Sequence, residues 1–238
     1  MSNPPSDDPV ALITGTRKGI GKHLAERLAA TGYRVIGCSR EPAGWQAENY
    51  EHVQADVSIE DDVKRLLAVV QKKHGRLDAV VNNAGIASMN HALLIPASTL
   101  DRVFAVNVRG TFLICREAAK LMRRRRFGRI VNMTTIAVPL ALEGESIYAA
   151  SKAAVESLTR VLSRELADFG ITVNAVGPSP VETDLIRGIP KDRIQKLLDR
   201  LPLRRHGTCE DVSNVVEFFI KPESGCITGQ VIYLGGAN

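Results

Sequence analysis

Short apolar runs alternate along this chain with longer stretches in which apolar residues recur every three or four positions. The short runs are typical of buried strands, and the longer pattern is typical of helices that bury one face. Their regular alternation predicts an α/β fold, a doubly wound parallel sheet of seven strands with helices on both faces. The strands are expected over residues 10–14, 34–38, 52–55, 77–81, 129–134, 171–176 and 230–234.

Glycines mark where several helices are expected to end. The first helix stops near Gly32, and Gly75 and Gly170 stand just past two others, where left-handed C-caps are common. Residues 41–50 include Pro42 and Gly44, so no full helix is expected between the second and third strands. The later helices are expected over residues 59–74, 99–125, 148–169, 191–201 and 209–220.

Length and composition fit one domain over residues 1–238, because 45% of the 238 residues are hydrophobic and no linker rich in Pro, Ser or Gly divides them. Residues 1–8 are polar and are expected to form a flexible tail. They lack the basic and apolar regions of a signal peptide, and no apolar run is long enough to span a bilayer. A cytoplasmic protein that does not enter membranes is expected.

Metal chemistry is not expected. The four cysteines lie far apart and form no C-x-x-C pair, and the five histidines show no ligand spacing such as H-E-x-x-H. Reduced thiols are the default in such a chain.

The net charge of +5 comes partly from one basic run, Arg123 to Arg126, which Arg129 follows. Such a run can be a solvated helix end, where cations suit the negative end of the macrodipole, or it can face an anionic partner. No aromatic residues are interleaved with it, and no nucleic-acid-binding module surrounds it, so nucleic acid is not an expected partner.

A glycine-rich turn, Thr14-Gly15-Thr16-Arg17-Lys18-Gly19-Ile20-Gly21, connects the first strand to the first helix. Gly15 permits a tight turn, while Gly19 and Gly21 let the backbone approach a phosphate and let the helix pack on the strand. The free N–H groups at the start of the helix suit a pyrophosphate. This arrangement predicts a dinucleotide site of the Rossmann type.

The second strand ends in Ser39-Arg40, where sites for an unmodified ribose tend to place an acidic residue. Arg40, together with Arg17 and Lys18 of the glycine turn, can converge on a 2′-phosphate. The pattern favours NADP(H) over NAD(H). The alternative is that these three are ordinary surface cations.

The stretch Ser146 to Lys152 places a phenol and an ammonium four residues apart, so Tyr148 and Lys152 are neighbours on one helix face. A nearby cation favours the phenolate and is expected to lower the pKa of the tyrosine toward the range useful for proton transfer. Taken alone, the pair is equally compatible with an exposed Tyr and a solvated Lys.

With these pieces in order, the chain resembles the classical short-chain dehydrogenase/reductase family over residues 11–236. The resemblance is carried by Thr14-Gly15-x-x-x-Gly19-x-Gly21, Asn82-Asn83-Ala84-Gly85, Asn107, Tyr148-x-x-x-Lys152 and Thr228-Gly229-Gln230.

The resemblance implies four catalytic residues. Tyr148 would protonate a carbonyl oxygen as hydride arrives from NADPH, and Lys152 would lower the tyrosine pKa and hold the nicotinamide ribose. Asn107 would hold a water in a proton relay to Lys152. Thr135 stands where the family has a serine and would polarise the carbonyl, with Thr134 and Ser146 as nearby substitutes.

The resemblance also implies a set of residues that bind the cofactor. They are Gly15, Arg17, Lys18, Gly19, Ile20, Gly21, Ser39, Arg40, Asp56, Val57, Asn83, Ala84, Gly85, Tyr148, Lys152, Pro178, Val181 and Thr183.

Within the family, residues 126–132 and 170–174 are most similar to β-ketoacyl-acyl carrier protein reductases. An acyl carrier protein near Arg126 and Arg129, and a homotetramer, are the partners that this implies. The expected activity is NADPH-dependent reduction of a 3-oxoacyl thioester to the 3-hydroxyacyl product. Reduction of free small ketones, aldehydes or quinones, or oxidation of alcohols, and a paralogue that binds NADPH without turnover, stay open as alternatives.

Overall fold

The computed structural model describes residues 8–184 and 186–237, so the expected tail lies largely outside the described residues. A seven-stranded sheet forms the centre, with strand order β3-β2-β1-β4-β5-β6-β7. Every neighbouring pair is parallel, which confirms the doubly wound fold expected from the alternation. The strands are β1 Val10–Thr14, β2 Arg34–Ser39, β3 Tyr50–Gln54, β4 Ala79–Asn82, β5 Gly128–Met133, β6 Ile171–Gly177 and β7 Val231–Tyr233.

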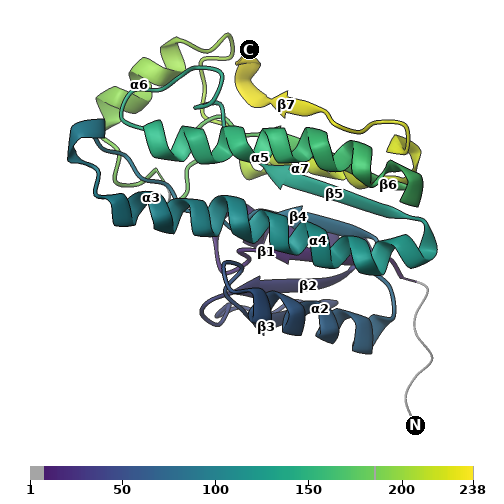
Figure 1. The fold of residues 1–238 in the computed structure, drawn as a ribbon. Coiled ribbons are helices and arrows are strands. Elements are labelled where there is room, and N and C mark those ends of the chain that lie inside the picture. Colours follow the sequence, from purple (N-terminus) through teal and green to yellow (C-terminus); the bar gives the residue numbers. More distant parts are fainter. Residues whose placement is uncertain (1–7, 185, 238) are drawn as a thin grey trace.

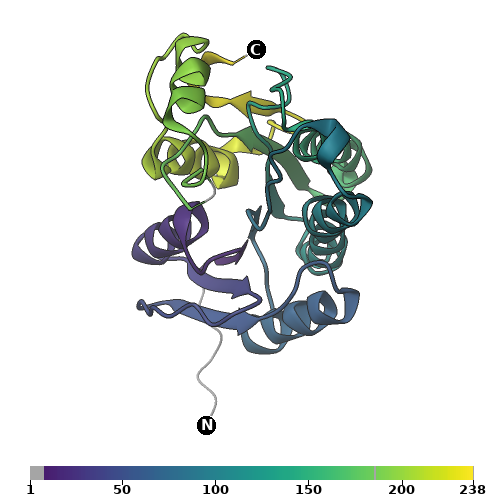
Figure 2. The ribbon, with the colours of Figure 1, turned by 90° about the vertical axis from the view of Figure 1, so that its left-hand side faces the viewer.

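Helices cover both faces of the sheet (Figures 1 and 2). On one face α1 and α7 share a buried apolar cluster with the strands, and on the other face α2, α4 and α5 do so. The helices are α1 Gly19–Ala30, α2 Glu60–His74, α3 Ala97–Phe104, α4 Thr111–Met122, α5 Ser146–Glu165, α6 Lys191–Asp199 and α7 Cys209–Ile220. No helix in this part of the chain is both long enough and apolar enough to cross a membrane.

The long helix expected over residues 99–125 is interrupted. Between α3 and α4, residues Ala105–Gly110 form a π-helical segment that contains Asn107, and a short 3₁₀ turn follows α4. π-Helical segments are frequent at functional sites because they turn side chains out of the regular helical register. Gly110 fits here because a Cβ at this position would lie 2.8 Å from Cγ2 of Val57.

Other expected bounds shift by a few residues. β3 begins at Tyr50, two residues earlier than expected, and pairs there with Val35 of β2. β7 is shorter than expected because the chain enters a 3₁₀ turn at Leu234, with Gly235 at a φ of 80°. The helix expected to reach 169 ends as α5 at Glu165, and a 3₁₀ turn leads to Gly170 in the left-handed conformation.

Candidate active site

A cavity of about 1080 Å³ lies beyond the carboxyl ends of the central strands. Parallel sheets bind ligands at this edge, where loops from several strands meet. Its lining includes nine of the expected residues: Ile20, Asn83, Gly85, Thr135, Tyr148, Lys152, Pro178, Val181 and Thr183.

Tyr148 and Lys152 lie in the first two turns of α5, one above the other on the face that packs on the sheet. Both are buried, with 9% and 4% of the residue exposed. Nζ of Lys152 donates to the carbonyl oxygen of Met133 at the end of β5, 2.8 Å away. The ammonium is thereby fixed to the sheet.

Burial moves both pKa values away from what the sequence suggests. The pKa of Tyr148 is raised to about 12, first by burial and then by the charge of Glu145, while a hydrogen bond from Thr135 acts in the lowering direction. Burial lowers the pKa of Lys152 to about 8. The expected lowering of the tyrosine pKa by Lys152 is therefore wrong for the protein alone, because loss of water around the phenol outweighs the benefit of nearby polar groups.

The hydroxyl donor beside Tyr148 is Thr135, which follows β5 and lines the cavity. Its Oγ1 also accepts from the amide of Ala137 at 3.2 Å, which fixes the rotamer. Thr134 is not a substitute, because its hydroxyl donates to Oε1 of buried Glu156 at 2.7 Å, away from the phenol.

Asn107 is fully buried in the π-helical segment. Its amide accepts from the N–H of Ile86 at 2.9 Å and donates to the Ile86 carbonyl at 2.9 Å and to Oγ of Ser151 at 3.0 Å. Both amide protons are thus committed, so the side chain positions residue 86 next to the cavity. A Cβ on Gly85 would lie 3.3 Å from both Oδ1 of Asn107 and Nζ of Lys152, which places these two groups around the same glycine.

The glycine turn fits a dinucleotide. Gly15 has a φ of 76°, and a Cβ on Gly21 would lie 2.3 Å from the carbonyl oxygen of Gly15 and 2.4 Å from Nδ2 of Asn83. Asn83 closes the turn by donating to the carbonyl of Thr14 at 2.9 Å, and the amide of Ala84 donates to the Thr14 hydroxyl at 2.9 Å. A side chain at Gly21 would collide with the chain's own atoms, so glycine is needed to keep the turn close to the start of α1, where a phosphate is expected.

The cations at the expected 2′-phosphate position are arranged differently from what the sequence suggests. Arg17 pairs with the carboxylate of Glu41, and Lys18 pairs with Asp184 at 2.5 Å. Arg40 is exposed at the end of β2. The three cations therefore do not all point to one place, because Arg17 already pairs with Glu41 and Lys18 with Asp184.

The remaining expected cofactor residues lie around the same edge. Asp56 follows β3, and its carboxylate accepts from the amide and hydroxyl of Ser58 at 2.9 and 2.7 Å. Val57 packs on Gly110, and Thr183 lies against Gly19, with Cγ2 3.4 Å from where a Cβ would be. Thr183 thus brings the segment before α6 down onto the glycine turn.

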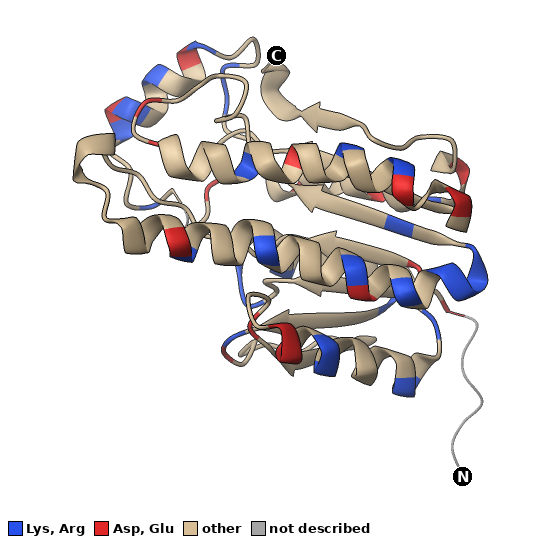
Figure 3. Cartoon of the chain, in the orientation of Figure 1, with Lys and Arg blue, Asp and Glu red and all other residues tan. Residues whose placement is uncertain are grey.

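Basic residues gather in the turn after α4 (Figure 3), but their exposure differs. Arg123 to Arg126 are exposed, but only 4% of Arg129 is. The Arg129 guanidinium donates to four backbone carbonyls, those of Gly128, Gly170, Lys221 and Pro222. The expectation that Arg129 offers its charge to a carrier protein is therefore wrong, since this side chain joins β5 to the segments before β6 and after α7.

Two residues with a bearing on the site were missed. Glu145 lies one turn before Tyr148 and acts on its pKa, a relation that the i, i+3 spacing could have indicated. Nε2 of His52 in β3 lies 3.1 Å from Oγ of Ser39 in β2. No local sequence pattern predicts this contact, because it depends on the pairing of β2 with β3. Among the described residues, no three His, Cys, Asp or Glu side chains gather as metal ligands.

Comparisons with known proteins place the chain in a family. A family model described as Enoyl-(Acyl carrier protein) reductase matches residues 15–237. The 3-oxoacyl-[acyl-carrier-protein] reductase FabG of Staphylococcus epidermidis is 35% identical over 95% of this chain and 97% of its own length, and that of Escherichia coli is 31% identical over 95% and 96%.

Solved structures extend the likeness to three dimensions. A 3-ketoacyl-(acyl-carrier-protein) reductase from Brucella melitensis, complexed with NADH, has a TM-score of 0.88 at 30% identity over 95% of this chain and 96% of its own. Levodione reductase has a TM-score of 0.89 at 28% identity over 96% of each chain. The chain therefore belongs to the short-chain dehydrogenase/reductase family, as an oxidoreductase with a nicotinamide cofactor.

Proposed function

We propose that the protein is an NADPH-dependent ketoreductase that converts a 3-oxoacyl thioester, carried on an acyl carrier protein, to the 3-hydroxyacyl product. The observation that carries the proposal is the position of the Tyr148 phenol. It is buried beside the hydroxyl of Thr135 and one turn from Lys152, at the wall of the large cavity.

Tyr148 is the general acid in this proposal. Because its pKa is about 12, the phenol stays protonated at neutral pH and can donate to a carbonyl oxygen that gains charge. Thr135 donates to the same oxygen and supports the charge as it develops. The bound nicotinamide would supply the hydride.

Lys152 and the glycine turn would position the cofactor. Lys152 is fixed against Met133, next to Gly85, so its remaining protons can reach a ribose hydroxyl at the cavity wall. Gly15, Gly19 and Gly21 would hold the pyrophosphate. The water relay implied for Asn107 would use its backbone or the second lone pair of Oδ1, since both amide protons are committed.

Variants at position 135 test the proposed donor. Thr135→Ala should lower kcat for ketone reduction by about 10²-fold, the usual cost of one oxyanion donor, whereas Thr135→Ser should retain most of the rate. Tyr148→Phe gives the kcat that remains without the proposed general acid. Steady-state kinetics with NADPH decide the matter, and full activity in the Ala variant would remove Thr135 from the mechanism.

The wall of the cavity supports a phosphorylated, carrier-linked substrate. Arg193, Lys196 and Arg200 of α6 and its C-cap are spaced at about one turn of the helix, and all three line the cavity. Such a cationic stripe suits the phosphate of a phosphopantetheine arm. The exposed run Arg123 to Arg126 could steer an acidic carrier protein toward the molecule at longer range.

A substrate panel separates the candidates. A 3-oxoacyl carrier protein, the matching N-acetylcysteamine thioester and a simple diketone are compared by the loss of NADPH absorbance. The proposal expects the highest kcat/KM for the carrier-bound substrate. A higher value for the diketone would favour a reductase of free small ketones, aldehydes or quinones, or a dehydrogenase of the corresponding alcohols, the class to which the structurally similar levodione reductase points.

No consumption of NADPH with any of these ketones would instead favour a paralogue that binds the nucleotide without turnover. Binding of NADPH to the inactive protein, measured by calorimetry, would complete that case. Replacement of NADPH by NADH in the same panel tests the cofactor preference.

We also expect a homotetramer. Aromatic and branched side chains are exposed on the outer faces of α4, α5 and α7, with 39% of Phe112, 49% of Val161 and 43% of Phe218 accessible in the single chain. Exposed apolar residues that gather into one patch mark protein–protein interfaces, and a homotetramer would place these helix faces against other copies of the chain. Light scattering coupled to gel filtration measures the assembly directly.

A further inference from the structure

A hydrogen-bonded chain runs beneath the end of β2, where the ribose of the cofactor is expected. It links Thr16 of the glycine turn, Tyr50 and His52 of β3, and Ser39 of β2. The Thr16 hydroxyl lies 2.8 Å from the Tyr50 hydroxyl, which lies 2.9 Å from Nδ1 of His52. On the other side of the ring, Nε2 of His52 lies 3.1 Å from Oγ of Ser39 and 3.2 Å from the carbonyl oxygen of Glu41.

The direction of these hydrogen bonds follows from the groups themselves. Ser39 donates its one proton to the Glu41 carbonyl, 2.6 Å away, because a carbonyl oxygen can only accept. Ser39 must then accept from His52, and the Glu41 carbonyl must do the same. Nε2 of His52 therefore carries a hydrogen, and the neutral ring is the Nε2–H tautomer.

The other end of the chain holds this tautomer in place. Nδ1 of the neutral ring accepts from the Tyr50 hydroxyl, which in turn accepts from Thr16. Tyr50 is stacked on Trp45 with ring centroids 4.1 Å apart, and the Trp45 indole donates to the Thr16 carbonyl at 3.0 Å. Burial raises the pKa of Tyr50 to about 12, so it remains a donor, and burial lowers the pKa of His52, which favours the neutral ring.

The fold leaves room for this chain at one glycine. A Cβ at Gly37 of β2 would lie 2.3 Å from Oγ1 of Thr16 and 2.4 Å from the Tyr50 hydroxyl oxygen. Contacts this short do not occur between a real Cβ atom and another heavy atom. The polar chain and the glycine thus depend on each other.

We propose that His52 is a positioning residue for the 2′-phosphate of the cofactor, because it lets Ser39 turn its hydroxyl proton toward that phosphate. When Ser39 rotates, Nε2–H of His52 takes over the Glu41 carbonyl, only 3.2 Å away, so no partner is lost. Before the phosphate binds, donation from His52 to Oγ holds the Ser39 hydroxyl in place. Arg40 and Arg17 supply charge, and Ser39 supplies a directed hydrogen bond. The inference rests on the proposed use of NADPH.

Two amide variants separate positioning from general structure. The amide nitrogen of Gln in His52→Gln can reach the place of Nε2 and donate to Ser39. The shorter side chain in His52→Asn can satisfy Tyr50 at the place of Nδ1 but cannot reach Ser39. Binding of adenosine 2′,5′-bisphosphate and of adenosine 5′-monophosphate to the full-length protein is measured by calorimetry, without turnover.

The expected result is selective. The Asn variant should bind the bisphosphate about five- to tenfold more weakly than the wild type, the range expected for one neutral hydrogen bond, and the monophosphate within about twofold. The Gln variant should bind both ligands nearly as the wild type does. In a Ser39→Ala background, the effect of His52→Asn should disappear, because the two residues then no longer act through one another.

Three outcomes would contradict the inference. Unchanged bisphosphate binding in His52→Asn, an equal loss for both ligands, or an undiminished effect in the Ser39→Ala background would each overturn the role of His52 while the preference of the wild type for the bisphosphate stands. A wild-type protein that binds the two ligands equally would overturn the proposed use of NADPH, and this inference with it.

Discussion

Two buried ionisable groups one helical turn apart carry the proposed chemistry at the scale of single residues. Tyr148 and Lys152 were readable from their spacing in the sequence, because four residues are about one turn. The direction of their pKa shifts was not, because it depends on how much water the fold removes. Residue identity therefore predicts the participants, and burial decides their protonation.

Lys152 should make the protein less stable at neutral pH than a neutral residue would. Its pKa is about 8 in the folded protein and 10.5 for a lysine side chain in water, so below pH 8 folding must bury the ammonium. Wild-type stability should rise between pH 8 and 10.5 as the folded state releases a proton that the unfolded chain still holds. Lys152→Met should thus gain up to ~3 kcal/mol at pH 7, less the lost hydrogen bond to Met133.

Melting temperatures across pH 7 to 10 check this prediction. The advantage of Lys152→Met should narrow above pH 8 and should be absent in the control Tyr148→Phe, which keeps the lysine. A Met variant that is less stable at pH 7, or an advantage that grows with pH, would contradict the argument.

Glu145 should set the pH at which Tyr148 can act as a base in alcohol oxidation. Burial is the main cause of the raised pKa of Tyr148, and the negative charge of Glu145 raises it further, so Glu145→Gln should move the rise of kcat/KM for oxidation about one pH unit lower. Glu143→Gln, an exposed change on the same loop, is the matched control. The pH profiles of both variants are compared with that of the wild type, and an unmoved profile for Glu145→Gln would rule the effect out.

Glu41 should lower the affinity for a 2′-phosphate, because it pairs with Arg17, one of the cations proposed to bind that phosphate. The pair is exposed, with 42% and 65% of the two side chains accessible, so the expected gain in NADP⁺ affinity for Glu41→Gln is small, about two- to fivefold. NAD⁺ affinity should stay within about twofold. Glu48→Gln, in the same loop with the same charge change, should alter neither, and calorimetric titration shows whether it does.

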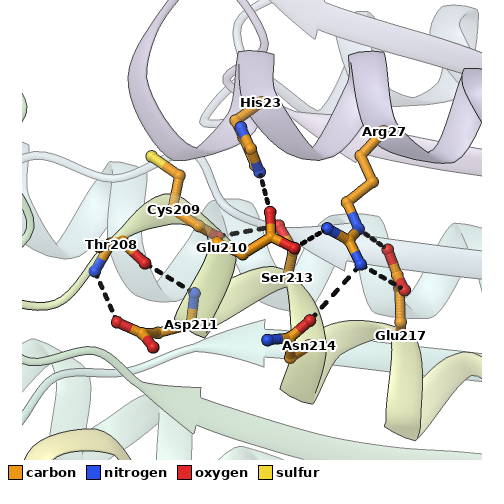
Figure 4. Close-up of polar contacts among 9 residues, drawn as sticks. All are labelled: His23, Arg27, Thr208, Cys209, Glu210, Asp211, Ser213, Asn214 and Glu217. Atoms are coloured by element: carbon orange, nitrogen blue, oxygen red, sulfur yellow. Dashed lines mark hydrogen bonds and ion pairs between the residues drawn. The ribbon is translucent and has the colours of Figure 1, made fainter.

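At the scale of elements, α1 and α7 are joined by polar contacts as well as by an apolar seam (Figure 4). Arg27 of α1 pairs with Glu210 and Glu217 of α7, and His23 lies 3.4 Å from Glu210. The start of α7 is closed by a capping box between Thr208 and Asp211. These contacts fix the helix pair that covers one face of the sheet.

The capping box gives a stability prediction. In Thr208→Ala the amide of Asp211 loses its acceptor, 3.0 Å away, and the free energy of unfolding should fall by ~1 kcal/mol. Thr208→Ser keeps the acceptor and should cost little. Denaturant melts of the two variants test this, and an Ala variant as stable as the Ser variant would show that the cap contributes nothing measurable.

Some of the elements could be predicted from sequence patterns, and one could not. The strands and most helices could be predicted, because each buries one apolar face or a continuous apolar run. The π-helical segment could not, since its Asn107 is bonded to Ile86, 21 residues away, and no local pattern shows that contact. An asparagine deep in a helix is visible in the sequence, but its partners Ile86 and Ser151 are not.

At the scale of the whole molecule, the parallel alternation predicts that the strand ends gather the candidate site residues, and nine of these residues line one cavity at that edge of the sheet. Contacts between residues far apart in the sequence could not be predicted from it. Arg129 looked like a surface cation in a basic run, yet the fold encloses it among carbonyls of residues up to 93 positions away. Charge is visible in a sequence, whereas the backbone that surrounds it is not.

Lys18 and Asp184 are 166 positions apart, and their exposed ion pair ties the segment before α6 to the glycine turn. The pair is exposed, with 56% and 37% of the two side chains accessible, so dissolved salt screens it. We expect concentrated salt to loosen this tie between two distant segments of the chain, and dilute buffer to strengthen it.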